Sequence, residues 1–417
     1  MTRYSDICNW LYRIARERNG ENVETELNGV PVLVIQRLED ADHVLRLKAD
    51  DYPKNMTWFR QTLGASRFSE NGEAWVIRRD LSQPYFNRFD RDRALRNARK
   101  YALQALVEMS ASGDQGAERL DDSIFRQMTA SVLIESFFDV EPDRFQVDIR
   151  NLASLMELGS EYSFVPAGRT QTMSRDRIAL LPGLRRQVFE DFKPLREGYL
   201  ADNPLIAGML AADQDPGNDI VLEHELLTFF AAGTETTAAT ISWAAYLLAA
   251  HPEVQQRLRE ETERLWNSGA HDWAALSRLE LLEAFISETM RLFPATPILA
   301  RLAQASDRIG DKPIEPGQNV LISLIGVQHD RRFCQDPWSL HLEKRKGAPN
   351  LGTGTAFSFG PRICGGKKFA LVELAGVLDV FLRHGDFRLT MAQPPVFHWK
   401  SQMLYEGGQP VRVRLRD

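Results

Sequence analysis

Cysteine is scarce in this sequence, and its scarcity removes several classes of protein from consideration. The 417 residues contain three cysteines, Cys8, Cys334 and Cys364, which lie far apart and form no CxxC or CxxCH motif. A disulfide scaffold, a zinc knuckle and covalently attached c-type haem are therefore not expected. Because the number of cysteines is odd, at least one thiol has no partner within the chain.

The sequence also lacks an excess of positive charge and a long apolar run. Lys and Arg number 51 against 57 Asp and Glu, a formal net charge of -6, so no basic field would attract nucleic acid or an anionic membrane. The most apolar stretch, 229–250, contains Glu235 and several threonines, which favours a buried helix over a membrane span. Residues 1–20 are amphipathic and charged, unlike a signal peptide or an anchor. We expect a cytoplasmic protein with no nucleic-acid partner and no membrane anchor.

Hydrophobic periodicity predicts a mainly α-helical fold with small β-sheets. Val23 to Gln36 holds two β-favouring runs around Asn28-Gly29, which predicts a hairpin. Three- and four-residue spacing of apolar side chains predicts helices over 122–138, 221–250 and most other parts of 40–292. The further expected elements are strands within 295–330, a helix over 367–384 capped by Gly385, and a strand over 411–416. No repeat or linker divides these parts, so 1–417 should form a single domain.

The most informative segment is Phe357 to Gly366, FSFGPRICGG, just before the last predicted helix. Its glycines let the backbone turn sharply, and Cys364 then lies where free N–H groups and the helix dipole stabilise a thiolate. The Arg362 guanidinium suits a carboxylate. A thiolate beside a carboxylate-binding group suggests haem, whose iron takes an axial ligand and whose propionates take arginines. A buried free cysteine in a glycine-rich loop is the alternative, but the pattern Phe-x-x-Gly-x-Arg-x-Cys-x-Gly is completely filled and favours haem.

This segment resembles the signature of the cytochrome P-450 superfamily of haem-thiolate monooxygenases. The resemblance implies the P-450 fold, with haem b between the long helix and the helix that follows the cysteine. It implies that Cys364 is the proximal iron ligand, that Arg362 contacts a propionate and that Phe357 packs near the thiolate. The other residues expected at the haem by this resemblance are Trp75, Arg79, Arg301, Gly360 and Gly366.

The long helix contains a second motif, AGTETT, from Ala232 to Thr237. Gly233 costs roughly 1 kcal/mol against alanine in a helix, and the Thr236 hydroxyl can bond back to the Ala232 carbonyl and open the helix locally. Glu235 beside Thr236 supplies an acid next to a hydroxyl, the parts of a proton relay. Close packing of small residues is the alternative. The segment matches the P-450 oxygen-activation motif, which implies that Ala232 and Gly233 lie at the haem and that Glu235 and Thr236 are catalytic, with dioxygen activated in preference to peroxide.

Glu288 and Arg291 are one helical turn apart, among apolar residues and before a Phe-Pro stop. They resemble the buried Glu-Arg element of the family, for which Arg345 is the expected third member. Buried charges of this kind must all be paired, so we expect this network to stabilise the fold and not to do chemistry. Glu261 and Arg264 have the same spacing and are expected to form a solvated surface pair.

The resemblance also implies partners. The substrate should be a hydrophobic small molecule, with terpenoid, fatty-acyl, aromatic and polyketide classes all open. The residues expected to line its pocket are Met56, Trp58, Phe59, Phe164, Val165, Phe230, Ala231, Ala295, Ile298 and Leu299. Since the resemblance covers the whole chain, electrons should come from a separate ferredoxin or flavodoxin and its reductase, which would dock at Lys367 and Lys368. We expect a monomer, and a non-catalytic haem sensor is the alternative function.

Overall fold

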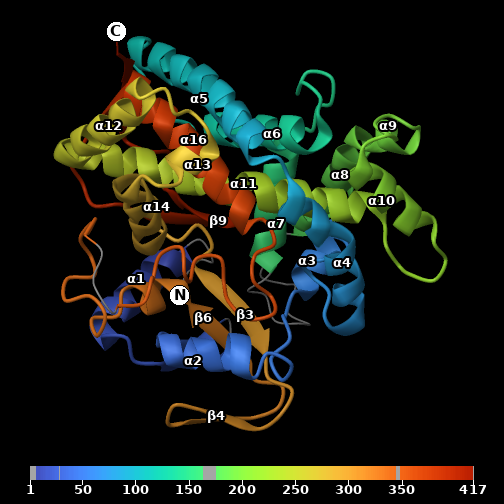
Figure 1. Ribbon diagram of the computed structural model, residues 1–417. Helices are drawn as coiled ribbons and strands as arrows, with labels where there is room; N and C mark the ends of the chain where they lie inside the picture. The colour runs from blue at the N-terminus through green and yellow to red at the C-terminus, as the bar shows by residue number, and fades with distance from the viewer. Residues whose placement is uncertain (1–5, 28, 163–174, 344–347, 417) are drawn as a thin grey trace.

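The computed structural model describes residues 6–27, 29–162, 175–343 and 348–416, and it is mainly helical with small β-sheets, as the sequence predicts. Figure 1 shows a large helical body, with the long helix α11 (Leu222–Ala250) crossing its middle, and a smaller region below it that holds the sheet formed by β3 and β6. The termini lie apart, the N-terminus beside this sheet region and the C-terminus at the far end of the helical body.

Helices make up most of the chain. Those before α11 are α1 (Ile7–Arg18), α2 (Leu38–Asp42) with a π-helical turn over His43–Leu47, α3 (Thr57–Leu63), α4 (Gly72–Arg88), α5 (Arg91–Asp114), α6 (Asp122–Phe138), α7 (Ile149–Tyr162), α8 (Arg175–Asp191), α9 (Lys193–Arg196) and α10 (Pro204–Gln214). Those after it are α12 (Pro252–Asn267), α13 (Trp273–Leu276), α14 (Glu280–Leu292), α15 (Leu324–Gln328) and α16 (Lys367–His384). Acidic side chains cap some N-termini: Asp121, for example, accepts the N–H of Ser123 at 2.8 Å at the start of α6.

The principal sheet joins the N-terminal hairpin to two strands from residues 298–323. The predicted hairpin is confirmed as β1 (Val23–Leu27) paired antiparallel with β2 (Val30–Ile35). β2 runs parallel to β6 (Asn319–Ser323), which is antiparallel to β3 (Ile298–Leu302), so the order is β1-β2-β6-β3. The remaining strands form two-stranded ladders: β4 (Asp307–Ile309) with β5 (Lys312–Ile314), β7 (Gly385–Leu389) with β10 (Val411–Leu415), and β8 (Phe397–Lys400) with β9 (Gln402–Tyr405).

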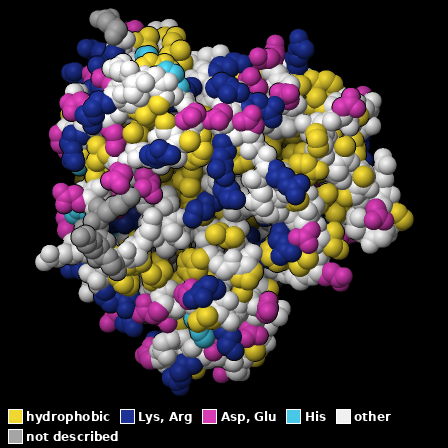
Figure 2. All heavy atoms as spheres, viewed as in Figure 1, with side chains coloured by type: hydrophobic (Ala, Val, Ile, Leu, Met, Phe, Trp, Pro, Cys, Tyr) yellow, Lys and Arg dark blue, Asp and Glu magenta, His cyan; other side chains and the backbone are white. Residues whose placement is uncertain are grey.

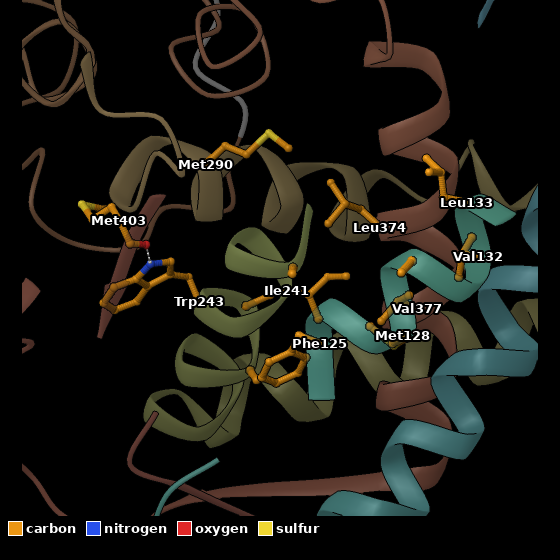
Figure 3. Packing of buried hydrophobic residues seen from close by; sticks show 14 of the residues in the cluster. Phe125, Met128, Val132, Leu133, Ile241, Trp243, Met290, Leu374, Val377 and Met403 are labelled. Atoms are coloured by element: carbon orange, nitrogen blue, oxygen red, sulfur yellow. Dashed lines mark hydrogen bonds between the residues drawn. The ribbon is translucent and has the colours of Figure 1, made fainter. Parts of the chain in front are cut away.

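The main hydrophobic core lies where α5, α6, α11, α14 and α16 meet. Figure 3 shows Phe125 of α6 next to Ile241 of α11, and Met128, further along α6, next to Val377 of α16. Trp243, also on α11, is fully buried and donates its indole N–H to the Met403 carbonyl at 2.8 Å, which ties the long helix to β9. Burying aromatic and branched side chains from several helices in one cluster fixes the position of α11 in the fold.

Two local predictions differ from the structure. Gly385 follows α16 but has an extended backbone, with φ at -117°, and begins β7 instead of forming a left-handed cap. A Cβ at this position would lie 2.8 Å from the Phe381 carbonyl oxygen, so space and not backbone conformation demands glycine. The apolar run up to Val327 has the composition of a strand, but it is a strand only as far as Ser323. The helix α15 begins at Leu324, and the Ser323 hydroxyl caps it by accepting the Gly326 N–H at 3.0 Å.

Candidate haem and oxygen site

The loop before α16 presents Cys364 at the start of that helix. The loop is closed by a hydrogen bond from the Cys364 N–H to the Phe357 carbonyl at 2.9 Å. Gly366 is the N-cap of α16, and a Cβ there would lie 4.0 Å from the Cys364 sulfur, an ordinary contact distance. The predicted arrangement of a cysteine at a helix N-terminus is therefore present.

Gly360 is the residue of this loop whose backbone requires glycine. Its φ is +75°, in the left-handed region, and a Cβ would lie 2.1 Å from the Leu45 carbonyl oxygen. A larger residue would both strain the backbone and clash with the π-helical turn His43–Leu47. Gly360 thus holds the cysteine loop close to the sheet region.

The Cys364 thiol lies in a recess. The residue keeps accessible surface, while the protein packed around it raises the pKa of the thiol. Four groups act in the opposite direction: the backbone N–H groups of Gly366 and Lys367, and the positive charges of Arg67 and Lys54. These groups favour the thiolate, the form that binds iron.

A group of four cations, which we call the basic cluster, lies beside this thiol: Arg301 is buried, and Lys54, Arg67 and Arg362 are half-buried. Burial lowers the pKa of all four, to about 10 for Arg301 and about 9 for Arg362. For Lys54 and Arg362 the repulsion of the other cations adds to this effect. The basic cluster therefore concentrates positive charge where solvent screens it poorly.

The cations of the basic cluster bond to neutral oxygens. Arg362 donates to Asn71 Oδ1 at 3.0 Å, Arg301 to the Ala300 carbonyl at 2.8 Å, and Lys54 to the Phe68 carbonyl at 3.2 Å. Arg67 donates to the Ser82 hydroxyl at 2.9 Å and to the Gln83 amide oxygen. Buried cations against neutral acceptors are costly unless an anion offsets their charge.

These residues fit a haem. The two propionates of a haem would offset the positive charge of the basic cluster, and the thiolate of Cys364 would hold its iron. Arg362 and Arg301 were predicted to contact propionates, and the structure brings both into this cluster. Lys54 and Arg67 were not predicted, because they belong to no recognisable spacing and reach the site only through the chain fold.

Trp75 and Arg79 lie at the margin of the basic cluster. The Arg362 guanidinium lies 4.5 Å from the Trp75 ring centre and that of Arg79 lies 4.9 Å from it. Arg79 pairs with Asp80 at 2.7 Å and is partly exposed, whereas its neighbour Arg78 is fully buried. Trp75 therefore supports Arg362 by a cation–π contact, and Arg79 is held by a carboxylate on its own helix.

One face of α11 is accessible at the oxygen motif. Within α11, all of whose residues are described, Ala232 is the exposed residue, and Gly233 and Thr236 are half-buried. The predicted back-bond is present, since the Thr236 hydroxyl donates to the Ala232 carbonyl at 2.9 Å. The helix nevertheless stays unbroken through this segment, so the predicted local opening is absent from it. A Cβ on Gly233 would lie 2.6 Å from Leu133 Cδ1, so close packing on α6 is the reason for glycine here.

Glu235 points away from this accessible face. Its side chain is buried against α6, and Oε2 accepts a hydrogen bond from Arg126 Nε at 3.0 Å. Burial raises the pKa of the Glu235 carboxyl, with Arg126 opposing the shift. The acid and the hydroxyl of Thr236 are adjacent in sequence but lie on different sides of the helix, as a rotation of about 100° per residue requires.

Aromatic rings connect the cysteine helix to the oxygen motif. The Phe369 ring of α16 lies 4.8 Å from the Phe137 ring of α6, and the Phe137 ring lies 5.1 Å from Phe229 of α11, centre to centre. Phe369 follows Cys364 by about one turn of helix, and Phe229 precedes Ala232 by about one turn. This packing places the two motifs, far apart in sequence, on neighbouring parts of one core.

The Glu288–Arg291 pair is confirmed. Arg291 Nε and Nη2 donate to the two Glu288 oxygens at 2.7 and 2.8 Å, and Nη2 also donates to the Ser339 carbonyl at 2.8 Å. Arg345, the predicted third member, lies outside the described residues. In the described part of the chain the carbonyls of Pro337 and Ser339 complete the bonding of Arg291.

Glu261 does not form the predicted surface pair. Its two carboxylate oxygens accept the backbone N–H groups of Leu281 and Leu282 at 3.0 and 2.9 Å. The side chain therefore caps the N-terminus of α14, where a negative charge is favourable.

Three of the residues predicted to line the substrate pocket have almost no accessible surface. Phe59, Phe230 and Ala231 are buried in the hydrophobic core, with Phe230 packed on Phe192 at 5.8 Å between ring centres. These residues therefore cannot line an accessible pocket. Phe164 and Val165 lie outside the described residues. The predicted lining residues that keep accessible surface are Met56, Trp58, Ala295, Ile298 and Leu299.

Similarity to known proteins agrees with this geometry. A crystal structure of a mutant cytochrome P450DA haem domain has the same fold, with a TM-score of 0.78, 17% identity, and 99% of this chain and 94% of that one covered. Human cytochrome P450 4F12 is 26% identical over 92% of this chain and 80% of its own length, and the carotene epsilon-monooxygenase of Arabidopsis thaliana is 26% identical over 85% and 72%. A probable cytochrome P450 4d20 of Drosophila melanogaster is 35% identical over 41% of this chain and 35% of its own length.

The family model described as Cytochrome P450 matches residues 4–408. That range contains the cysteine loop, the basic cluster and the oxygen motif of α11. The chain therefore belongs to the cytochrome P450 family of haem-containing monooxygenases.

Proposed function

We propose that this P450 binds haem b through Cys364 and activates dioxygen with two externally supplied electrons to oxidise a hydrophobic small molecule. The observation that carries the proposal is the accessible Cys364 residue at the start of α16, beside a basic cluster whose side chains bond to neutral oxygens and form no close ion pair with the described carboxylates. When bound, the haem supplies the iron at which oxygen is activated, and the thiolate ligand favours cleavage of the O–O bond.

The cysteine side of the site would hold the cofactor. The thiolate is favoured by the N–H groups of Gly366 and Lys367, and the basic cluster would bind the two propionates by charge-assisted hydrogen bonds. Because the cations are buried, each such bond is stronger than it would be in water. Phe357, whose ring centre lies 5.4 Å from Lys367 Nζ, is proposed to pack near the thiolate.

The α11 side would supply protons. Thr236 keeps accessible surface, and its hydroxyl donates its hydrogen to the Ala232 carbonyl. The lone pairs of the hydroxyl oxygen can therefore accept a hydrogen bond from another group. Burial raises the pKa of the Glu235 carboxyl, which favours its protonated form, the form that can donate a proton. We propose that Glu235 and Thr236 together deliver protons during oxygen activation.

The substrate is proposed to be lipid-like or aromatic. The accessible predicted lining residues are apolar or aromatic, which suits a ligand held mainly by burial of hydrophobic surface. The Arabidopsis relative is named for its action on carotene. That name supports terpenoids among the candidate classes, which also include fatty-acyl, aromatic and polyketide compounds.

Electrons are proposed to come from a separate ferredoxin or flavodoxin with its reductase. Ile363 and Lys368, on either side of Cys364, are both exposed, whereas Lys367 is occupied by the Thr353 carbonyl at 3.0 Å. Figure 2 shows Lys and Arg side chains mixed with hydrophobic ones near the middle of the face drawn. An apolar surface beside a basic one suits docking of an acidic electron carrier. The substitution Lys368→Glu should therefore weaken the salt dependence of haem reduction by that carrier. The substitution Lys367→Glu should mainly destabilise the cysteine loop, because it removes the bond to the Thr353 carbonyl.

Two further properties are the cellular location of the protein and its oligomeric state. Among the described residues, no helix has both the length and the apolar character needed to cross a membrane. We propose a cytoplasmic monomer; the location is the expectation for a sequence whose first 20 residues resemble neither a signal peptide nor an anchor. Fractionation of the native cell and sedimentation of the purified haem-loaded protein would test the two parts.

The carbon monoxide difference spectrum of the reduced protein tests the iron ligand. We expect the red-shifted Soret band of a thiolate-bound haem in the wild type and its loss in Cys364→Ser, while Cys334→Ser, at a buried cysteine remote in sequence from the loop, keeps the band. A wild type without the band would contradict the proposal. Product formation that depends on an electron donor would separate a monooxygenase from a haem sensor, which consumes no electrons in turnover.

A further inference from the structure

A second buried acid, Glu225, lies in the first turn of α11, and neither the sequence nor the oxygen chemistry assigns it a role. Its side chain is 4% exposed. Oε2 accepts the backbone N–H of Arg67 at 3.2 Å, and Oε1 lies 3.1 Å from Nε of Arg78 on α4. Oε1 receives no hydrogen bond from the described residues, so it can carry a proton. Glu225 therefore joins the start of α11 to α4 and to the loop between α3 and α4.

Arg67, a member of the basic cluster, reaches from this acid to the cysteine loop. Its Nη1 donates to the Ser82 hydroxyl at 2.9 Å. Its Nη2 lies so close to Gly365 that a Cβ on that glycine would be 2.5 Å away. Glu225 thus holds the backbone of a residue whose guanidinium packs against the loop that carries Cys364.

The charge of Arg67 is shared between two acidic groups. Burial lowers the pKa of Arg67, and the negative charges of Cys364 and Glu225 are the two largest effects that raise it. In turn, the positive charge of Arg67 lowers the pKa of the Cys364 thiol. Because one cation acts on both groups, an ionised Glu225 offsets part of the positive charge that stabilises the thiolate.

We propose that Glu225 is a positioning residue that holds Arg67 against the cysteine loop and, through its own charge, adjusts the field of Arg67 at the Cys364 sulfur. This inference rests on the proposed binding of haem through Cys364 and adds a control of the haem reduction potential. Reduction adds one electron, taken from the external donor, to the haem. A protonated Glu225 leaves the Arg67 charge unopposed and favours the ferrous haem, whereas an ionised Glu225 favours the ferric haem. Reduction is therefore accompanied by uptake of part of one proton from solvent at Glu225.

Glu225 is placed to change its charge near neutral pH. Burial raises its pKa to about 7, against the backbone N–H that it accepts and the positive charge of Arg78. Arg78 also donates to Asp219, in the segment before α11, at 2.8 Å, and this bond holds the pKa of Asp219 below its ordinary value. Asp219 therefore stays ionised over the range in which Glu225 titrates.

The other charged groups at this end of α11 belong to α3, the following loop, α8, α9 and α11 itself. His224 lies beside Arg185 of α8, and burial lowers its pKa to about 4, so it is neutral where Glu225 titrates. The remaining groups form ion pairs with each other: Arg60 with Glu70, and Glu223 with Arg196. Glu225 is thus the group of this set expected to change charge between about pH 5.5 and pH 8.5.

The reduction potential of the haem-loaded protein, followed by spectroelectrochemistry across this pH range, tests the proposal. In the wild type, the ratio of ferrous to ferric haem at a fixed applied potential should fall about threefold or more as pH rises, with a midpoint near pH 7. Glu225→Gln keeps an oxygen that can accept the Arg67 N–H but cannot ionise, so it should lose this step and keep the higher ratio. Glu223→Gln, at a neighbouring acid of the same helix that pairs with Arg196, is the matched control and should keep the step.

A double-variant cycle tests whether the acid acts through Arg67. In an Arg67→Gln background, Glu225→Gln should change the ferrous-to-ferric ratio at about pH 8.5 much less than it does in the wild type. If Glu225→Gln does not retain haem, Glu225→Asp takes its place and should keep the step with a shifted midpoint.

Three results would overturn the proposal: a wild type without the step, an equal step in Glu225→Gln, or an undiminished effect of Glu225→Gln in the Arg67→Gln background. A flat profile in Glu225→Asp would contradict it as well. The carbon monoxide difference spectrum of the same preparations separates the two levels of inference. A normal thiolate Soret band together with any of these results would show that the role of Glu225 has failed and that haem binding through Cys364 has not.

Discussion

Two buried glutamate–arginine pairs in this protein have the same chemistry and very different surroundings. Glu288 and Arg291 are one turn apart on α14 and use both carboxylate oxygens and several guanidinium nitrogens, with the His341 N–H adding a bond to Glu288 at 2.9 Å. Glu235 and Arg126 come from different helices and share one hydrogen bond, and Glu235 Oε1 has no partner among the described residues.

The difference separates a structural role from a chemical one. A buried pair whose hydrogen bonds are all made holds its neighbours in one arrangement, and removing either member leaves an unpaired charge. A buried pair with a free oxygen and a raised carboxyl pKa can change its protonation at modest cost. The first pair should therefore control stability and the second should control turnover.

The largest expected effect is on the structural pair. Arg291→Ala should lower the free energy of unfolding by about 3–5 kcal/mol, because it leaves the Glu288 charge and the Ser339 carbonyl without their partner. Denaturant unfolding measures this change. Arg264→Ala, at an exposed arginine of α12, is the control and should stay within about 0.5 kcal/mol of wild type. Equal losses in both variants would remove the distinction between buried and surface arginines.

The next effect should fall on catalysis. Glu235→Gln should reduce product formation by about 10²-fold because it removes an ionisable proton donor, while the unfolding free energy near pH 4.5, where the folded wild-type carboxyl is favoured in its protonated form, changes by less than about 1 kcal/mol. Product formed per electron consumed and denaturant unfolding of the same preparation measure the two quantities. If Glu235→Gln instead lost several kcal/mol of stability and kept its turnover, the two pairs would have the same role.

A smaller effect on stability is expected from the packing of Gly233, two residues before Glu235, against Leu133 of α6. Gly233→Ala places a methyl group 2.6 Å from Leu133 Cδ1 and should cost about 1–3 kcal/mol, more than the gain in helix propensity returns. The double variant Gly233→Ala with Leu133→Ala should recover part of that loss. Recovery would show that the steric contact between α6 and α11, and not helix propensity, determines glycine at this residue.

The smallest effect is a dependence of stability on pH. Because the folded pKa of Glu235 is raised above its ordinary value of 4.5, the folded state binds more protons than the unfolded state above that pH. The free energy of unfolding of the wild type should therefore fall relative to that of Glu235→Gln as pH rises from 4.5 toward the folded pKa. The total fall is about 1.4 kcal/mol for each unit by which the folded pKa exceeds the unfolded pKa. Urea unfolding of both proteins across this range gives the difference, and a constant difference would contradict a raised pKa.

Features encoded within one element were predictable from the sequence. Apolar spacing predicted α6 and α11, the Asn-Gly turn predicted the β1–β2 hairpin, and Glu288 with Arg291 was recognised because residues three apart on a helix share a face. The cysteine loop was recognised for the same reason, since all its fixed residues lie within ten consecutive residues.

Features that join distant segments were not predictable. Arg126 is separated from Glu235 by 109 residues, and nothing in its own segment marks it as a partner for an acid. Phe230 has the composition of a pocket residue, yet the packing of α11 turns it into the core. The direction in which a side chain of a buried helix points depends on which neighbours cover each face, and those neighbours are set by the fold.

The sequence by itself identified the family, and it predicted Cys364 as the thiolate ligand and Glu235 with Thr236 as an acid–alcohol pair, because these features depend on residue type and short spacing. Only the tertiary structure decided that Glu235 turns away from Thr236 toward Arg126, and that Lys54 and Arg67 join Arg301 and Arg362 beside Cys364. The physical reason is that charge interactions depend on distance and burial, and both arise only when helices far apart in the sequence pack together.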